Sequence, residues 1–367
     1  MGLSGDEKRF EEYVERQQQL QREKMASSAR ARMDPLPCDQ LAERVAQRSA
    51  SRRRTNVMVL TITLVIGLML VGLWWLLRPR PRAFVQEPVQ VLYAQMAGLP
   101  LEMEGRMGIR QRLIPPGAFE MGSPLDEPGR KINEAQRKVS FSRPFYIAAT
   151  EITQWQYQDV MGTNPVPDSE ARASAPVCYV TWEDAVRFCN ALSRQEGLPE
   201  SYRQVDGIWF CNLKDGGYRL PLETEWEYAC RAGSRDAFYT GPIQPEQAGR
   251  RNLARAAWFI DNSGAHAHDV AQKEANRWGL FDMLGNVEEW CMEGVEKDPL
   301  PDDIRLALVS EEHTRMLRGG GWYSDFLNCR IAARQSRNQE IAMNSVGFRC
   351  VRSIPGDVPI AGVAVSK

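Results

Sequence analysis

Histidine is scarce in this chain, which carries three among 367 residues. His266 and His268 stand two positions apart beside Asp269, and His313 lies in a separate polar stretch. Few residues are therefore available as the histidine base of a Ser-His-Asp or Cys-His mechanism. The paired imidazoles suit a metal, but no third ligand is evident beyond Asp269, so we expect an exposed polar loop there. His313 is expected to be solvated.

Sequence motifs of common metal, redox and nucleotide-binding sites are also missing. The eight cysteines include no Cys-x-x-Cys pair, so neither a zinc site nor a thioredoxin-like centre is indicated. There is no Walker loop or dinucleotide fingerprint. The run Gly319-Gly320-Gly321 precedes no helical pattern and is better explained by close backbone packing. The formal net charge is −1, so the charge balance gives no support for a nucleic-acid partner.

One long hydrophobic run is present. Residues 57–77 carry no ionisable group, and such a run is long enough to cross a bilayer core of about 30 Å as a helix. Trp74 and Trp75 lie at its far end, where an interfacial aromatic belt is expected. Because a cleaved signal peptide would have a shorter apolar core nearer Met1, we predict an uncleaved transmembrane anchor at 55–78. Arginines are more numerous before the run, which favours a cytoplasmic amino terminus and a periplasmic or otherwise extracytoplasmic body.

Composition divides the chain into five parts, of which the anchor is the second. Residues 1–54 are rich in Arg, Glu and Gln with a thin apolar stripe. This pattern predicts either a solvated helix that pairs with another helix or a disordered segment. A linker at 79–105 begins with alternating prolines, which favour an extended stalk, and residues 86–105 are expected to pack as a lead-in helix. The body then spans 106–353, and a tail covers 354–367.

Within the body, the apolar patterns predict short strands and a few helices. Strands are expected at 107–113, 119–121, 145–148 and 177–181. Helices are expected at 153–161 with Thr153 as N-cap, at 182–194 and at 220–233. Residues 234–276 lack periodicity and are rich in Gly and Pro, so we expect long loops on a small strand framework. Loops carried by a framework suit binding.

The segment Trp278–Trp290 combines large aromatics with a Gly-Asn turn and three carboxylates. Gly and Asn both tolerate left-handed backbone, so we expect a compact loop fastened into the core at each end. Asp282 and Glu289 flank the turn closely enough for a curled backbone to direct both carboxylates to one point. The carbonyls of Gly285 and Val287 can join them, giving the oxygen ligands that Ca²⁺ prefers. Spacing alone leaves open a tight turn with solvated acids.

Ordered motifs along the body resemble one known family. They comprise Gly-Ala-Phe-Glu-Met-Gly-Ser at 117–123, Glu-Ile-Thr-Gln-Trp-Gln-Tyr at 151–157, Val-Thr-Trp-Glu-Asp-Ala at 180–185, the run Tyr-Arg-Leu-Pro-Leu-Glu-Thr-Glu-Trp-Glu-Tyr-Ala at 218–229, the loop at 278–290, Arg-Gly-Gly-Gly-Trp at 318–322 and Val-Gly-Phe-Arg at 346–349. In this order they resemble the formylglycine-generating enzyme (sulfatase-modifying factor) family over about residues 106–353. The resemblance implies a single α+β domain of the C-type-lectin-like kind, with little regular secondary structure and bound calcium, here preceded by one transmembrane helix.

The resemblance also assigns roles to residues of this chain. Its calcium loop falls on Asp282, Gly285, Val287 and Glu289, and a second calcium site would lie near 258–262 without identifiable ligands. The family's disulfides imply the pairs Cys189–Cys350 and Cys230–Cys329, although Cys329 is displaced by two residues from the family position. Two bridges would suit an oxidising, extracytoplasmic compartment. The alternative is buried free thiols, and Cys178, Cys211 and Cys291 have no assigned partner.

The chain departs from the family's enzymes at the residues that carry their chemistry. Those enzymes oxidise a substrate cysteine to formylglycine with copper and O₂, and the copper lies on two thiolates separated by four residues. Here Ser324 stands at the position of the first thiol. Cys329 has the spacing of the second thiol, or, counted from Ala332, is nearer a family disulfide position. Because a hydroxyl is a poor Cu(I) ligand, we expect neither copper nor formylglycine-generating activity.

Two classes of function remain open. The first is a membrane-anchored, non-enzymatic binding or scaffold module whose loops bind a protein, peptide or glycan outside the cytoplasm. The loss of the thiol pair on an otherwise intact scaffold favours it. The second is an oxidoreductase with divergent chemistry on a protein or peptide substrate, with candidate groups at Trp322, Ser324, Arg330 and Arg334. Metal analysis separates the two classes, because the binding module would hold calcium alone and the oxidoreductase copper or iron.

Overall fold

The computed structural model describes residues 15–27, 87–293, 306–308 and 313–355, with the single positions 61, 63, 67 and 69. The chain divides into two compact units, Met1–Pro79 and Arg80–Lys367. In the first unit, residues 15–27 are helical with exposed side chains. No helix in the described part of the chain is both long and apolar enough to cross a bilayer. The predicted anchor at 55–78 lies almost entirely outside the described residues.

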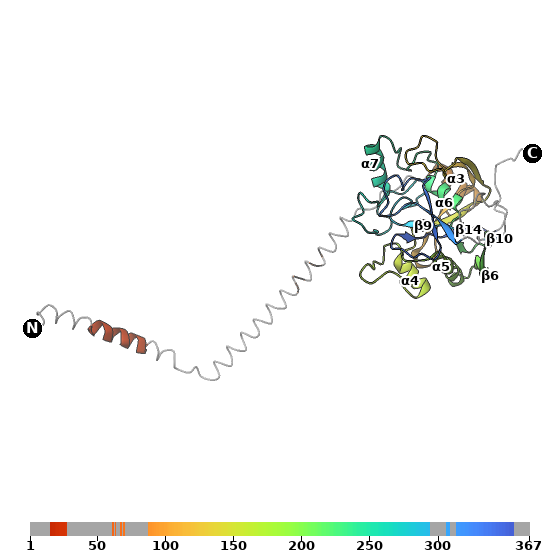
Figure 1. The fold of residues 1–367 in the computed structure, drawn as a ribbon. Coiled ribbons are helices and arrows are strands. Elements are labelled where there is room, and N and C mark those ends of the chain that lie inside the picture. Colours follow the sequence, from red (N-terminus) through yellow and green to blue (C-terminus); the bar gives the residue numbers. More distant parts are fainter. Residues whose placement is uncertain are drawn as a thin grey trace, which may run out of the picture. The chain divides into compact units, whose positions relative to one another are not determined.

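The second unit is an α+β domain of small sheets and short helices (Figure 1). Its largest sheet has five strands in the order β1-β2-β5-β14-β8, and each adjacent pair is antiparallel. These strands are β1 (Glu102–Glu104), β2 (Arg110–Ile114), β5 (Phe145–Ala148), β14 (Val351–Ser353) and β8 (Tyr218–Arg219). The sheet therefore joins the beginning of the domain to its end.

Three smaller sheets complete the strand framework. A four-stranded sheet has the order β12-β11-β9-β13, in which β13 runs parallel to β9. Its strands are β9 (Glu288–Trp290), β11 (Thr314–Arg318), β12 (Arg334–Asn338) and β13 (Val346–Gly347). The remaining strands are β3 (Gly117–Met121) paired with β4 (Arg137–Phe141), and β6 (Tyr202–Val205), β7 (Ile208–Asn212) and β10 (Leu306–Leu308) in one sheet. A short 3₁₀ turn, η1 (Arg106–Gly108), precedes β2.

The helices begin and end largely where the sequence signals place them. They are α3 (Pro88–Ala97), α4 (Gln154–Met161), α5 (Trp182–Gln195), α6 (Glu223–Arg231) and α7 (Glu246–Ala256). Thr153 caps α4 and Thr181 caps α5, each through a reciprocal capping box. The predictions at 153–161 and 182–194 are therefore confirmed. Helices α3 and α6 lie within the segments predicted at 86–105 and 220–233.

The core consists mainly of two apolar clusters. In the first, Phe188 of α5 stacks on Tyr157 of α4 with ring centroids 5.4 Å apart and meets Phe348 edge-on at 5.2 Å. The second surrounds α6 and includes Trp226 and Trp278. Trp278 and Trp290 are both buried, which confirms that the loop between them is fastened into the core at each end. Aromatic pairs of this kind contribute about 0.5–1.5 kcal/mol each beyond their burial.

Two predictions from the apolar pattern are wrong. Residues 177–181 form no strand, because successive amides bond to different segments: Val177 N donates to Ile152 O, and Tyr179 N donates to Met343 O. The loop region at 234–276 contains a helix, α7. Its inner face is made of the small residue Gly249 together with Leu253 and Ala256, so the apolar stripe is too thin to stand out in the sequence.

Candidate functional site

The loop between Trp278 and Trp290 adopts the curled backbone that its Gly-Asn turn predicts. Asp282, Gly285 and Asn286 have φ angles of 55°, 74° and 61°. A Cβ on Gly285 would lie 2.3 Å from the Trp258 carbonyl oxygen, so this position accepts no side chain. The turn therefore depends on glycine for both its conformation and its close approach to Trp258.

Asn286, at the tip of this turn, connects three segments. Its Nδ2 donates to Glu151 Oε2 at 2.8 Å, and its Oδ1 accepts from the backbone amide of His268 at 2.8 Å. Its backbone carbonyl accepts from the amide of Trp322 at 2.7 Å. The residue has no exposed surface, so these bonds hold the turn, the 268 segment and the glycine-rich 319–322 segment in one arrangement.

Three buried carboxylates surround the turn. Glu289 accepts from Arg349 Nε and Nη2, both at 2.7 Å, and from Trp226 Nε1 at 2.8 Å. Asp282 accepts through Oδ2 from the amide of Ala271 at 2.7 Å, whereas its buried Oδ1 has no hydrogen-bond partner among the described residues. Burial raises the pKa of Asp282 to about 6. Burial, together with the charges of Asp282 and Glu289, raises the pKa of Glu151 well above its usual range.

The predicted calcium ligands fit this geometry in part. In the part of the chain that the structure describes, no three His, Cys, Asp or Glu side chains converge as a metal cluster. The predicted set has only two carboxylates, with the carbonyls of Gly285 and Val287 as the other donors. Asp282 Oδ1 is an open acceptor that a cation would satisfy, but Glu289 shares its oxygens with Arg349. Calcium at Asp282, Gly285, Val287 and Glu289 therefore stays a prediction.

Ser324 and Cys329 contact consecutive glycines. The amide of Gly321 donates to Ser324 Oγ at 3.0 Å. Cys329 Sγ packs so closely on Gly320 that a Cβ there would lie 2.9 Å from the sulfur. Both side chains are buried. The interpretation of the triple glycine as close backbone packing is confirmed, and the pair at this position consists of one hydroxyl, already bonded, and one thiol.

The two arginines proposed as candidate groups around Ser324 form internal ion pairs instead. Arg330, with no exposed surface, donates to Glu127 at 2.6 Å and to both oxygens of Glu134 at 2.8 and 2.9 Å. Arg334 pairs with Glu223, close to Arg318. The charges of both arginines are therefore matched within the fold. Their role as candidate groups of a divergent oxidoreductase stays a prediction.

The cysteines that the structure describes are all buried free thiols. Cys189 Sγ and Cys350 Sγ lie 3.7 Å apart, so this predicted pair is brought together without a bond. Cys230 Sγ lies 3.8 Å from the carbonyl oxygen of Met283. Cys329 Sγ contacts Gly320. Both disulfides stay predictions.

A cavity of about 490 Å³ lies where the start of α4, the loop 166–179 and the loop 265–267 meet Trp322. Its volume is in the range of ordinary ligand pockets, roughly 300–1,000 Å³. Its walls combine aromatic, amide and charged groups and one thiol, chiefly from Gln154, Arg172, Cys178, Tyr179, His266 and Trp322. We call this cavity the cleft.

Tyr179 holds an unusual conformation on one wall of the cleft. Its φ is 59°, a left-handed value that is disfavoured for a bulky residue and that concentrates at functional positions. Its hydroxyl donates to the Glu170 carboxylate, at 3.2 Å to Oε2 and 3.3 Å to Oε1. On another wall, Trp322 Nε1 donates to the carbonyl of Asn344 at 3.2 Å. Two aromatic rings are thus held in place by hydrogen bonds at the edge of the cavity.

Of the two histidines expected on a polar loop, His266 lines the cleft and His268 packs beside it. The ring of His266 is 4.4 Å from that of His268, which stacks on Trp258 at 3.8 Å. Lys273 Nζ lies 3.7 Å from the centre of the Trp258 ring. Burial lowers the pKa of His268. His266 is exposed as predicted, whereas His268 is partly buried, and His313 is exposed as expected.

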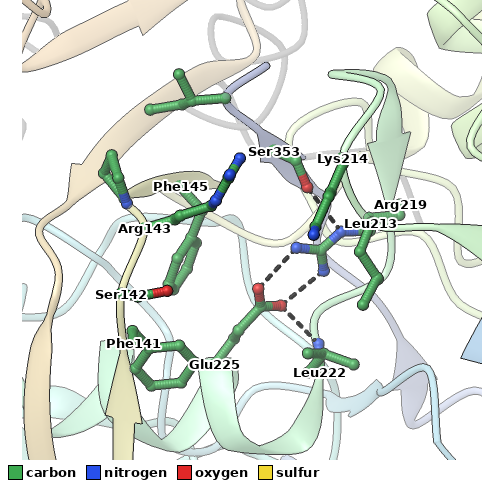
Figure 2. A pocket seen from close by; sticks show the side chains of 12 residues that line it. Phe141, Ser142, Arg143, Phe145, Leu213, Lys214, Arg219, Leu222, Glu225 and Ser353 are labelled. Atoms are coloured by element: carbon green, nitrogen blue, oxygen red, sulfur yellow. Dashed lines mark hydrogen bonds and ion pairs between the residues drawn. The ribbon is translucent and has the colours of Figure 1, made fainter. Parts of the chain in front are cut away.

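A second, much smaller pocket of about 60 Å³ lies between α6 and the segment leading into β5. Figure 2 shows the Arg219 guanidinium facing the Glu225 carboxylate on its wall. Both Nη atoms of Arg219 lie 2.6 Å from that carboxylate, and its Nε donates to Ser353 Oγ at 3.1 Å. These charges are mutually satisfied and the space is about that of a few waters, so the cleft is the stronger candidate for ligand binding.

Sequence reasoning identified Trp322 but missed most of the cleft. The walls come from loops that lack periodicity and carry no chemical motif, so position in the sequence gave little indication that they meet. Glu151 was recognised only as part of a motif. Its role in holding Asn286 and the amide of Val287 (3.1 Å) depends on a contact across more than a hundred residues. The only signal for Glu151 in the sequence was its position two residues before Thr153, the N-cap of α4.

Comparison with known proteins finds a matching family model and, among others, two similar proteins and one similar solved structure. Residues 102–354 match the family model described as a sulfatase-modifying factor enzyme 1-like domain. The chain is 32% identical over 268 residues to a Paenibacillus barcinonensis protein named chaperone protein LppX, covering 66% of this chain and 88% of that protein. It is 26% identical over 279 residues to a Streptomyces coelicolor formylglycine-generating enzyme, covering 65% and 87%. Among solved structures, Treponema denticola variable protein 1 shares 27% identity with a TM-score of 0.60, covering 70% of this chain and all of that one.

Proposed function

Because the chain belongs to the family of sulfatase-modifying factor enzyme 1-like domains, we propose that it is a membrane-anchored binding module without formylglycine-generating activity. The observation that carries the proposal is the hydroxyl of Ser324, which accepts from the Gly321 amide where the family's enzymes place a thiolate. With Cys329 as the single thiol at this position, the donor set does not suit Cu(I), which favours two soft sulfur ligands.

Restoring the missing thiol tests this proposal directly. Ser324 and Cys329 contact the adjacent glycines Gly321 and Gly320, so Ser324→Cys would bring two thiols to one short loop. We expect the unaltered protein to carry no stoichiometric copper and to produce no aldehyde on a cysteine-containing peptide. Ser324→Cys is expected to gain Cu(I) binding, and Ser324→Ala serves as the control. Stoichiometric copper or aldehyde formation with the unaltered protein would refute the proposal and favour the alternative, an oxidoreductase with divergent chemistry.

The cleft is the proposed binding surface, and its partner is an exposed segment of another protein. Trp322 and Tyr179 supply aromatic surface, while Glu170, Arg172 and Gln154 supply polar groups at the same cavity. Such a mixture is typical of sites that recognise peptides, with aromatic residues as the main contributors. The similarity to a protein named a chaperone supports a protein partner over a small molecule.

A photo-crosslinking amino acid tests whether the cleft is occupied. We place it at Ala267, on the wall of the cleft, and at Ile132, which is 95% exposed in the loop between β3 and β4. The proposal predicts protein adducts at position 267 that decrease at least several-fold in a Trp322→Ala variant. Trp155→Ala is the matched control, because Trp155 is half exposed but does not line the cavity. Equal adducts at 267 and 132, or no effect of Trp322→Ala, would contradict a binding role for the cleft.

The membrane anchor and the calcium ion complete the proposal. The apolar run at 57–77 supports a single span with the domain on the extracytoplasmic side. Retention in the membrane after alkaline carbonate washing, with the domain accessible to protease from outside, tests both parts. Calcium on Asp282 would also stabilise the cleft, because Asn286 of the same turn bonds Trp322 and the His268 segment.

A further inference from the structure

Helix α3 presents an apolar stripe to the outside of the domain. Val89, Leu92 and Met96 are 63%, 57% and 49% exposed, and their spacing places them on one face of the helix. The opposite face is buried: Gln90 Nε2 donates to the Leu113 carbonyl at 2.6 Å, and Ala94 joins a small apolar cluster. The helix contains no charged residue. Its rotation is thus fixed by the domain, with the apolar side chains outward.

This stripe differs from the other exposed apolar residues of the described domain. Those are single side chains on separate loops, strands and helix ends, such as Leu125, Trp155 and Ile260. Isolated exposed apolar residues are ordinary on a protein surface. Three aligned on one uncharged helix indicate a surface that contacts something apolar.

The length of the linker between the predicted span and α3, which we call the tether, limits what can cover the stripe. Only residues 79–87 separate the predicted span from the start of α3, and an extended chain of that length reaches at most about 30 Å. A domain of about 250 residues has a diameter of roughly 45 Å, judged from its expected radius of gyration. The tether is therefore shorter than the domain is wide, so among the surfaces of the domain it is the one near α3 whose distance from the predicted span is limited most.

We propose that Val89, Leu92 and Met96 dock into the interfacial layer of the membrane that the predicted span at 55–78 crosses. The proposal rests on the membrane anchor of the proposed function. An interfacial helix buries its apolar face at the boundary between headgroups and acyl chains, and the domain takes the place of the polar face here. Figure 1 shows α3 in the upper part of the domain and α4 at its lower edge. Docking through α3 would consequently leave the cleft, which begins at Gln154 of α4, open to partners.

Spin labelling of the full chain in phosphatidylcholine–phosphatidylglycerol vesicles tests the docking. The described cysteines are buried, so a Cys38→Ser background allows a nitroxide to be placed at single positions. We compare Leu92→Cys, at a position that is 57% exposed, with Ile132→Cys, at a 95% exposed apolar site on the loop between β3 and β4. Power saturation with O₂ and with water-soluble nickel chelate then measures lipid and water contact separately. Docking predicts a ratio of oxygen to nickel accessibility several-fold higher at 92 than at 132.

The outcomes separate this inference from the proposed function. Carbonate washing reports on the span independently of α3. If the protein is retained but position 92 is as accessible to nickel as position 132, the docking is refuted and the anchor stands. If position 92 is shielded from both reagents, a protein surface or a second copy covers the stripe, which also refutes docking in lipid. If the protein washes off the membrane, the anchor itself is refuted, and the inference with it.

Discussion

Replacing Arg330 with methionine should destabilise the domain strongly without any catalytic role being involved. Its guanidinium is fully buried and pairs with Glu127 and Glu134, while its Nη2 and Nε also donate to the carbonyls of Gly129 and Leu327 at 2.6 and 2.8 Å. Apart from Leu327, these partners lie about two hundred positions away in the sequence. Arg330 thereby fixes the loop between β3 and β4 onto the 327–330 segment.

The expected magnitude follows from burial. Methionine preserves much of the side-chain volume but leaves two carboxylates in a site that no longer neutralises them, and Glu134 has no exposed side-chain surface. Removing one partner of a buried ion pair typically costs about 3–5 kcal/mol. For a domain of about 250 residues, that loss lowers the melting temperature by roughly 6–20 °C. Tryptophan fluorescence during thermal or urea unfolding measures the change.

A matched variant separates burial from charge. Arg250 also pairs with two carboxylates, Glu246 and Asp261, but its side chain is 41% exposed. Arg250→Met should therefore change the unfolding free energy by no more than about 1 kcal/mol. Adding Glu127→Gln and Glu134→Gln to Arg330→Met should recover part of the loss, because the unpaired charges are then removed. Equal effects of the two arginine substitutions, or no recovery, would show that the reasoning from buried charge is wrong.

Three further predictions concern the metal, the thiols and pH. Removing calcium with EGTA should lower the melting temperature, since an ion present at a hundred times its Kd stabilises by about 2.7 kcal/mol; Asp282→Asn should abolish the difference, and an unchanged melting curve in EGTA would argue against the site. Protein purified from an oxidising compartment should yield a linked peptide containing Cys189 and Cys350 by mass spectrometry; recovery of all eight cysteines as free thiols would contradict that bridge. Because burial lowers the pKa of His268, its contribution to stability is complete above the unfolded pKa of about 6.5 and declines as the pH falls from there towards the folded value. The melting temperature should therefore decrease with acidification in this window, and His268→Gln should weaken the dependence; a curve unaltered by that substitution would exclude His268 as its source.

The parts of the fold that depend on local signals could be predicted from the sequence. Thr153 and Thr181 start their helices because each offers an oxygen to an unpaired amide three residues on, and such a signal needs no knowledge of the rest of the chain. The strand predicted at 177–181 failed for the opposite reason. Its apolar residues are buried in the core, but the backbone bonds go to Ile152 and Met343. Burial alone cannot distinguish a strand from an irregular segment that crosses the core.

The candidate site likewise has parts that could be predicted from the sequence and parts that could not. The Gly-Asn turn was predictable because a left-handed turn restricts residue type at specific positions. The cleft was not, because it exists only where five separate stretches of the chain meet. The partners of Arg330 and Arg334 could not be predicted, because a charged residue near a functional motif has the same appearance in sequence whether it faces a substrate or a buried carboxylate. Only the partners, Glu134 and Glu223, decide between the two.

The arrangement of buried charges would hold this scaffold together without the redox centre whose loss we propose. Arg349 with Glu289, and Arg318 with Glu227, join strands and helices on both sides of the glycine-rich segment. None of these contacts involves a thiol. At the position of the family's first thiol, Ser324 bonds the Gly321 amide and so satisfies a backbone group that would otherwise be buried unpaired. Under the proposed function, exchange of that thiol for a hydroxyl would remove a copper ligand while leaving these ion pairs in place, so the proposed loss of activity would require no change in the surface proposed to bind a partner.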